Sequence, residues 1–239
     1  FRRVLFRSPA GAETPSGAVP PVPTSARSFR PRRRGLAPAR AEAFERMLTR
    51  WSLAESGEVL DLAELFPDQC DVVLDIGFGG GEGLIEMAAT RPAEAIIGVE
   101  VHTPGVASVL DAIEANGWSH VGVAMTDVID FMPRIPPASL AAIRLWFPDP
   151  WPKNKQKHRR LVRPALVAEW ADRLRPGGVL HIATDIIDYA AHAKAVLAAE
   201  PSFVGGVVER PAWRPLTRFE ARGLAEGRTA IDLWYEKVR

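Results

Sequence analysis

The residues of this sequence best suited to chemistry surround Asp149. An apolar run, 141–147, stops at a Pro-Asp-Pro turn, so the carboxyl group of Asp149 is expected on a stiff loop between two prolines. Trp146 and Trp151 flank this turn, and a basic run follows as far as Arg160. A carboxylate, aromatic rings and clustered cations together favour a site that reads a nucleobase. A rigid turn after a buried strand, followed by a solvated basic helix start, is the alternative.

The cations after Asp149 form the second part of this expected site. At the mouth of a binding pocket they would make a track for phosphate groups. Without a pocket they would be an ordinary solvated helix start. The cations are Lys153, Lys155, Lys157, Arg159, Arg160 and Arg163.

A glycine-rich segment, Asp-Ile-Gly-Phe-Gly-Gly-Gly-Glu-Gly at 75–83, follows a short β-branched run and precedes a helical pattern. Glycines let the backbone turn tightly and approach a ligand where a side chain would collide. The dinucleotide spacing Gly-x-Gly-x-x-Gly fails from Gly77, Gly79 and Gly81, because no glycine stands at the third place. The pattern that fits is an acid, Asp75, ahead of alternating glycines. It favours cofactor binding over a purely structural turn.

Two further acids stand at the ends of the next two predicted strands. Glu100 lies about twenty residues beyond the glycine segment, where a carboxylate can accept hydrogen bonds from both hydroxyls of a ribose. Asp127 closes the third predicted strand. Either acid alone would be expected to cap a helix or face solvent. Their positions at successive strand ends beside a glycine loop favour a binding role.

Short β-branched runs alternate with helical patterns along most of the chain. This alternation predicts an α/β fold, a doubly wound, mostly parallel sheet with helices on both faces and a working site at the carboxyl ends of the strands. The turn Arg-Pro-Gly-Gly at 175–178 is expected to stop a helix and to precede a strand that begins at Val179. The predicted strands are 72–76, 95–99, 121–125, 141–147, 179–183 and 230–238, and the predicted helices are 39–51, 84–89, 106–113, 161–174 and 190–199.

Composition fits one large domain or one domain with a tail. The chain has 239 residues, of which 47% are hydrophobic and 25% charged. Residues 1–38 are rich in proline and arginine, so we expect a disordered basic tail, with 27–34 either a nucleic-acid arm or simply solvated. We expect the folded domain over 39–239. The formal net charge is only +1, so any affinity for nucleic acid must come from local patches.

Several classes of protein are disfavoured. No apolar run approaches the roughly 20 residues that span a bilayer, so we expect no membrane segment. The single cysteine, Cys70, allows no internal disulfide, and with no secretory signal a cytoplasmic location is expected. Five scattered histidines without metal-ligand spacing argue against a metal site. We expect His102 and Trp118 to be structural.

The motifs resemble a known family. The segment 75–83 is similar to the first motif of class I S-adenosylmethionine-dependent methyltransferases, whose cofactor lacks a pyrophosphate and has a cationic methionine end suited to a carboxylate. The motif Phe-Pro-Asp-Pro-Trp at 147–151 resembles one found in the bacterial tRNA (guanine-N7-)-methyltransferases. The resemblance extends over nearly everything from Arg27 onward and is also carried by 98–102, 183–185 and 217–223.

The resemblance implies a Rossmann-like class I methyltransferase sheet with an antiparallel last strand. It implies methyl transfer from S-adenosylmethionine to N7 of a guanosine in the variable loop of tRNA, with Asp149 as the catalytic residue. The implied cofactor contacts are Asp75, Gly77, Gly79, Glu100, Asp127 and Asp149, the last orienting the base as well. The implied substrate contacts are Lys153, Asp185, Thr217, Arg218, Phe219 and Glu220.

The chain departs from the family's usual basic run at Lys155, Gln156 and His158, which bears on the detailed tRNA contacts rather than on the reaction. From the residues alone, the segment 217–220 would be a polar loop before the last strand. Two other functions stay open. One is a base methyltransferase acting on an exocyclic amine, and the other a catalytically silent tRNA-binding protein. Both a monomer and a homodimer are compatible with the sequence.

Overall fold

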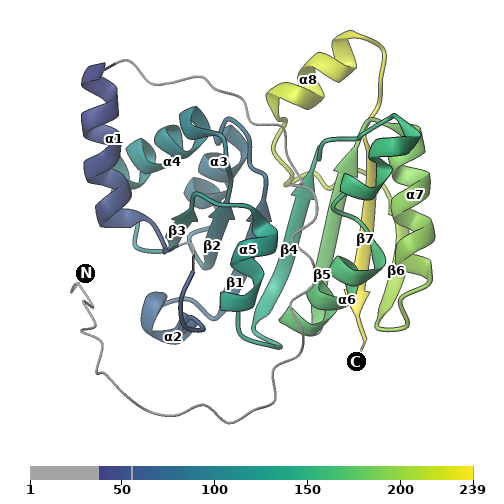
Figure 1. Ribbon diagram of the computed structural model, residues 1–239, viewed down its shortest axis with the longest axis horizontal. Helices are drawn as coiled ribbons and strands as arrows, with labels where there is room; N and C mark the ends of the chain where they lie inside the picture. The colour runs from purple at the N-terminus through teal and green to yellow at the C-terminus, as the bar shows by residue number, and fades with distance from the viewer. Residues whose placement is uncertain (1–37, 55, 239) are drawn as a thin grey trace.

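Seven strands of the described residues form one mixed sheet in the order β3-β2-β1-β4-β5-β7-β6 (Figure 1). The computed structural model describes residues 38–54 and 56–238. The predicted tail therefore lies, apart from its last residue, outside the described residues. The strands are β1 (Asp71–Ile76), β2 (Glu94–Val99), β3 (Val121–Ala124), β4 (Leu140–Trp146), β5 (Leu174–Thr184), β6 (Phe203–Val208) and β7 (Ile231–Lys237).

The strand directions confirm the predicted sheet. Strands β3, β2, β1, β4 and β5 pair in parallel, whereas β7 is antiparallel to both β5 and β6. The chain runs outward from β1 to β3 and then returns to place β4 on the other side of β1. The connections after β1 and β4 consequently leave the sheet in opposite directions, which opens a crevice at the carboxyl edge between these two strands.

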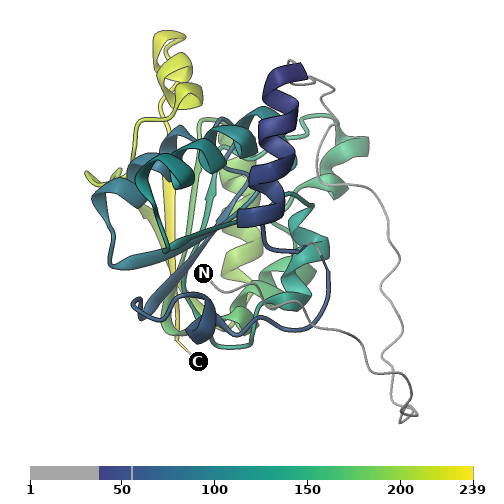
Figure 2. The same ribbon diagram turned by 90° about the vertical axis from the view of Figure 1, so that its left-hand side faces the viewer.

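Helices cover both faces of the sheet, as predicted (Figures 1 and 2). Helices α1, α3 and α4 contribute to one apolar cluster, and α5, α6 and α7 to the other. Neighbouring residues of β2 point into opposite clusters: Ile96 joins the first, and Ala95 and Ile97 the second. The helices are α1 (Pro38–Trp51), α2 (Leu62–Leu65), α3 (Glu82–Thr90), α4 (Thr103–Asn116), α5 (Val128–Phe131), α6 (Pro164–Arg173), α7 (Ile187–Ala198) and α8 (Arg218–Ala225), with 3-10 turns η1 (Met132–Arg134) and η2 (Asn154–Arg159).

Strand β5 begins earlier than predicted. Leu174 already pairs with Leu140, and after a register shift Val179 pairs with Ala142. The intervening Arg-Pro-Gly-Gly turn, with Gly177 at φ 75°, is therefore a bulge within the strand rather than the connection that precedes it. The predicted helix 161–174 was also too long, because it begins only at Pro164.

The short helices α2 and α5 and the 3-10 turn η1 were not predicted, and neither were two longer elements, β6 and α8. Strand β6 lies at the sheet edge, and the segment expected as a polar loop at 217–220 starts helix α8, which projects beyond the carboxyl edge in both views (Figures 1 and 2). Thr217 caps this helix, because its hydroxyl oxygen accepts a hydrogen bond from the backbone N–H of Glu220 at 3.2 Å.

No helix among residues 38–54 and 56–238 combines the length and the apolar character needed to cross a membrane.

Candidate active site

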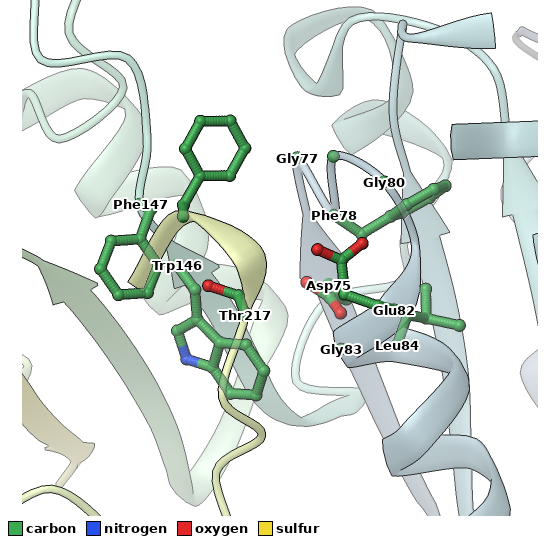
Figure 3. A pocket seen from close by; sticks show the side chains of 12 residues that line it. Asp75, Gly77, Phe78, Gly80, Glu82, Gly83, Leu84, Trp146, Phe147 and Thr217 are labelled. Atoms are coloured by element: carbon green, nitrogen blue, oxygen red, sulfur yellow. The ribbon is translucent and has the colours of Figure 1, made fainter. Parts of the chain in front are cut away.

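A pocket occupies the crevice between β1 and β4 (Figure 3). The glycine loop and the start of α3 form one side, and the end of β4 with the start of α8 forms the other. Segments more than a hundred residues apart in sequence thus meet at the predicted edge of the sheet. The lining residues are Asp75, Gly77, Phe78, Gly79, Gly80, Glu82, Gly83, Leu84, Trp146, Phe147, Thr217 and Phe219.

The glycine loop has a backbone conformation that ordinary side chains rarely adopt. Gly77 and Gly79 have φ values of 71° and 61°, and Gly81, the residue before α3, has a φ of 89°. Helix α4 packs directly on this loop: a Cβ added at Gly105 would lie 1.7 Å from the carbonyl oxygen of Gly79. The loop is therefore shaped by its own glycines and held from behind by α4.

Asp75 places a buried carboxyl group in the pocket (Figure 3). Only 3% of its surface is exposed. Burial raises the pKa of this group to about 6, and the charge of Glu100 adds to the rise, while the nearby Arg144 guanidinium opposes it. A carboxyl group in this position favours a ligand with a positive charge, because such a ligand stabilises the ionised form.

Glu100 braces the glycine loop. One carboxylate oxygen accepts a hydrogen bond from the backbone N–H of Gly79 at 2.7 Å, and the other accepts from Val101 and His102 at 2.6 and 2.8 Å. Three of about four acceptor positions of the carboxylate are thus taken by the backbone. Glu100 does not line the pocket, although it holds a residue that does.

Asp127 caps helix α5, which is the structural alternative that the sequence left open for it. Its side chain accepts a hydrogen bond from the backbone N–H of Ile129 at 3.1 Å. It lies outside the residues that line the pocket.

Backbone geometry and hydrogen bonds define the loop around Asp149, which was predicted to be stiff because of its prolines. Phe147 and Trp151 have φ values of 55° and 43°, a strained region for non-glycine residues. The backbone N–H of Phe147 donates to Ala183 at 2.7 Å, and Nε of Arg160 donates to the carbonyl oxygen of Pro150 at 3.0 Å. These bonds hold both sides of the turn.

Asp149 itself is exposed and does not line the pocket, whereas its neighbours Trp146 and Phe147 do. Trp151 is buried, with the guanidinium of Arg159 4.0 Å from its ring centroid. One of the two tryptophans predicted at this site thus contributes to the pocket wall, and the other packs inside the loop.

Fewer cations of the basic run are available to a ligand than its sequence indicates. Arg160 is buried and forms an ion pair with Asp188, and Lys157 pairs with the same carboxylate at 3.1 Å. Lys153 and Lys155 are exposed. A phosphate track at this position would rest mainly on these two lysines.

The segment 217–220 lies at the pocket, but its side chains point in different directions. Thr217 and Phe219 line the pocket. Arg218 is 87% exposed, and its backbone N–H donates to Glu82 at 3.2 Å. Glu220 is buried and turned away, because both of its oxygens accept hydrogen bonds from Arg214, at 2.6 and 2.8 Å.

Asp185 is not among the pocket residues. It follows β5 and pairs with Arg228 at 2.7 Å, which ties the carboxyl edge to the segment after α8.

Sequence reasoning missed the apolar side of the pocket. Phe78, Leu84, Phe147 and the acid Glu82 all line it without having been assigned to the site. Phe78 and Glu82 lie within the glycine segment, and Phe147 precedes the Pro-Asp-Pro turn, so proximity to the motifs was the available signal.

Within the part of the chain that the structure describes, no three His, Cys, Asp or Glu residues are grouped so that they could hold a metal ion.

Solved structures of similar shape show which fold this chain has. The 16S rRNA methyltransferase KamB superposes with a TM-score of 0.57 at 16% identity, covering 79% of this chain and 99% of that one. A variant of a 16S rRNA (adenine(1408)-N(1))-methyltransferase from Catenulisporales acidiphilia, with its cosubstrate, gives 0.54 at 14% identity and covers 74% and 90%. The fold is that of the class I methyltransferases.

Sequence relatives identify the family. The family model described as "Putative methyltransferase" matches residues 69–233. A tRNA (guanine-N(7)-)-methyltransferase of Streptomyces avermitilis is 43% identical over 219 residues, 89% of this chain and 76% of the relative. The corresponding protein of Bordetella pertussis is 40% identical over 222 residues, 91% and 87%. The chain belongs to the tRNA (guanine-N(7)-)-methyltransferase family, which confirms the resemblance seen in its motifs.

Proposed function

We propose that this protein transfers a methyl group from S-adenosylmethionine to N7 of a guanosine in the variable loop of tRNA. The observation that carries the proposal is the pocket in a chain of this family. The buried acid Asp75 and the glycine backbone form one side, and an aromatic wall, Trp146 and Phe147, stands opposite. A tRNA substrate also fits the reducing, cytoplasmic setting expected from the single free Cys70.

The residues present fit the cofactor. Asp75 would meet its cationic methionine end, and the open backbone at Gly77, where an added Cβ would touch nothing within 4 Å, leaves room for close approach. Glu100 would accept from one ribose hydroxyl, because its three backbone bonds leave about one acceptor position of the carboxylate. Asp127, at the start of α5 after β3, would meet the adenine amino group, as the family resemblance implies.

The reaction needs positioning rather than a base. S-adenosylmethionine supplies an electrophilic methyl group on a sulfonium. N7 of guanine has a free lone pair and no hydrogen, so no residue has to remove a proton. Methylation leaves a cationic ring, which the carboxylate of Asp149 would stabilise while accepting hydrogen bonds from N1 and the exocyclic amine. Asp149 stands two residues beyond the wall residue Phe147, so a guanine that reaches it would be bound at the pocket mouth, beside this loop.

The substrate contacts are proposed by position. Exposed Lys153 and Arg218 would meet phosphates, and Thr217 and Phe219 would meet the base at the pocket mouth. Asp185 and Glu220, which are committed to Arg228 and Arg214, would act by holding the substrate-facing segment in place.

The experiment that tests the function is methylation of unmodified tRNA with labelled S-adenosylmethionine, followed by nucleoside analysis. We expect 7-methylguanosine, and none with a tRNA whose variable-loop guanosine is replaced by adenosine. Label in a nucleoside methylated on an exocyclic amine would point to the amino-directed alternative. Binding of tRNA without methyl transfer would point to a catalytically silent protein.

The role of Asp149 has its own test. Asp149→Asn keeps the shape but deletes the charge, which should cost about 3 kcal/mol in the transition state, a hundredfold or more in single-turnover rate. Asp68→Asn, an exposed acid before β1, is the matched control and should leave the rate unchanged. A near-wild-type rate for Asp149→Asn would remove this residue from the mechanism.

A further inference from the structure

A continuous chain of buried polar groups runs behind the wall of the pocket formed by β4 and α8. We infer that Arg214 and His181 are positioning residues, which set the orientation of Trp146 and of the start of α8 through Asp232. The inference rests on the proposed function for the reaction it serves. The contacts among Arg214, His181 and Asp232 do not depend on which reaction the protein catalyses.

Arg214 joins helix α8 to strand β7. It is 1% exposed, and its guanidinium donates to both oxygens of Glu220 on α8, at 2.8 and 2.6 Å. On the β7 side, Nε lies 2.9 Å from one oxygen of Asp232, and a second nitrogen donates to the other at 3.2 Å. Arg210 adds a further bond to Glu220 at 2.9 Å. One planar guanidinium thus fixes α8 against the sheet, as its fork geometry allows.

His181 carries the chain on to the pocket wall. Its Nε2 lies 2.7 Å from Asp232, and its Nδ1 lies 3.1 Å from Nε1 of Trp146. An indole N–H only donates, so Nδ1 must accept and Nε2–H must donate to the carboxylate. His181 is therefore neutral. Burial, with the charges of Arg214 and Arg144, lowers the pKa of His181 against the opposing effect of Asp232, which agrees with this assignment.

The chain ends on the residues that face the glycine loop (Figure 3). The indole of Trp146 receives its direction from His181, and the guanidinium of Arg214 lies 5.6 Å from the ring centroid of Phe147. Thr217 and Phe219 stand on the helix that Glu220 anchors. Trp146 is thus held directly by His181, Phe147 contacts Arg214, and Thr217 and Phe219 are connected to Arg214 only through Glu220 on the same helix.

The charged and polar residue types of this buried network indicate that it positions the pocket wall and does not only stabilise the fold. Apolar side chains of similar volume would pack the sheet at least as well, because desolvating charges costs free energy. They would not, however, fix the rotation of an indole ring or the distance between α8 and β7. Trp213 packs against both rings, with its centroid 5.7 Å from that of His181 and 6.3 Å from that of Trp146, and His181 and Asp232 are each only 1% exposed.

The test compares variants that break the chain with one that restores it. His181→Leu removes both bonds, whereas His181→Gln offers an acceptor to Trp146 and a donor to Asp232. Arg214→Lys keeps the charge but loses the fork. We expect kcat for tRNA methylation to fall at least tenfold in His181→Leu and Arg214→Lys and to recover largely in His181→Gln. The Kd of S-adenosylmethionine should change less than threefold, since Asp75 and the glycine loop lie on the opposite side of the pocket.

Two buried groups at the far edge of the sheet serve as controls for general destabilisation. His120 bonds to the carbonyl oxygen of Ala88 at 3.1 Å, and Lys237 to that of Leu174 at 2.7 Å. His120→Leu and Lys237→Met should lower the melting temperature without the loss of kcat. Loss of kcat in these controls to the same extent would overturn the inference, as would wild-type kcat in folded His181→Leu.

A second measurement is independent of activity. The indole N–H resonance of Trp146, assigned by its loss in Trp146→Phe, should shift in His181→Leu and in Arg214→Lys and stay unchanged in His120→Leu. An unshifted resonance would overturn the inference whatever the enzyme does. Absence of 7-methylguanosine with the wild-type protein would instead overturn the proposed function, and the resonance would still decide the geometry.

Discussion

Asp75 is a buried carboxyl group whose ionisation should control cofactor binding. Its pKa of about 6, raised by burial, leaves it largely neutral below that pH when the pocket holds no ligand. A cationic ligand needs the carboxylate. We therefore expect affinity for S-adenosylmethionine, measured by calorimetry, to be level above pH 7 and to fall about tenfold per pH unit below pH 6.

The stability of the protein without ligand should depend on Asp75 with the opposite sign. The pKa is raised from its usual 3.8, so the folded protein holds this proton more tightly than the unfolded chain. The contribution to stability is complete below pH 3.8 and is lost as the pH rises through about 6. Asp75→Asn should flatten the stability profile between pH 3.8 and about 6 and the affinity profile below pH 6. An unchanged pH dependence of affinity in this variant would assign the effect to another group.

Glu100 has two roles that one substitution can test. Glu100→Gln keeps the size but removes the charge and places an amide N–H₂ where a backbone N–H now donates. Loss of a charge-assisted acceptor costs on the order of 1.5 to 3 kcal/mol, so we expect affinity for S-adenosylmethionine to fall roughly ten- to a hundredfold. Glu86→Gln, an exposed acid on α3, is the control. Wild-type affinity in calorimetry would count against the cofactor assignment.

At the scale of residues, the sequence identifies acids better than it identifies their partners. Asp75 was predictable because a motif gives both its type and its neighbours. The burial of Glu220 on α8 was not, because its partner Arg214 stands six residues earlier in a loop without periodic pattern, and Asp232, which Arg214 also contacts, lies on β7. Such a network depends on distances between elements, which spacing along the chain does not encode.

At the scale of elements, the contact of α4 with the glycine loop leaves no space for a side chain at Gly105. A Cβ at Gly105 would overlap the carbonyl oxygen of Gly79, so one of the two segments must move. We expect Gly105→Ala to weaken binding of S-adenosylmethionine at least tenfold. Gly117→Ala is informative beside it: no atom lies within 4 Å of its added Cβ, and its φ of 64° makes it a test of stability alone. Equal cofactor affinity in the two variants would contradict the proposed bracing.

The alternation of strands and helices predicted most elements because each buries a long apolar stretch. Strand β6 was missed because it contains two glycines, and exposed residues on both faces leave no alternating pattern at this sheet edge. Helix α8 was missed for a different reason. Its Thr-Arg-Phe-Glu start is a capping-box sequence, but the apolar residues Phe219 and Leu224 stay exposed, so no core-facing stripe marked it as a helix.

At the scale of the whole molecule, the fold brings the glycine loop and the Asp149 loop to the carboxyl edge of the sheet. The return of the chain to β4 places the Asp149 loop beside the glycine loop, although 74 residues separate Asp75 and Asp149 in sequence. With a net charge of only +1, binding of a polyanion must depend on where cations are exposed rather than on their number. The described structure leaves Lys153 and Lys155 exposed at this edge, whereas Arg160 is used inside.

This distribution predicts how tRNA binding responds to salt. Each phosphate contact contributes roughly 0.7 to 0.9 to the slope of log K against log salt, so Lys153→Glu with Lys155→Glu should reduce that slope by about 1.4 to 1.8. Binding should weaken for all tRNAs alike, while affinity for S-adenosylmethionine stays unchanged, because these lysines carry no base-specific contact. Lys194→Glu, an exposed cation on α7 further from the carboxyl edge, should change affinity only slightly and leave the slope as it is. A slope that responds equally to both kinds of reversal would mean that tRNA senses the overall charge, and the phosphate track after Asp149 would have to be abandoned.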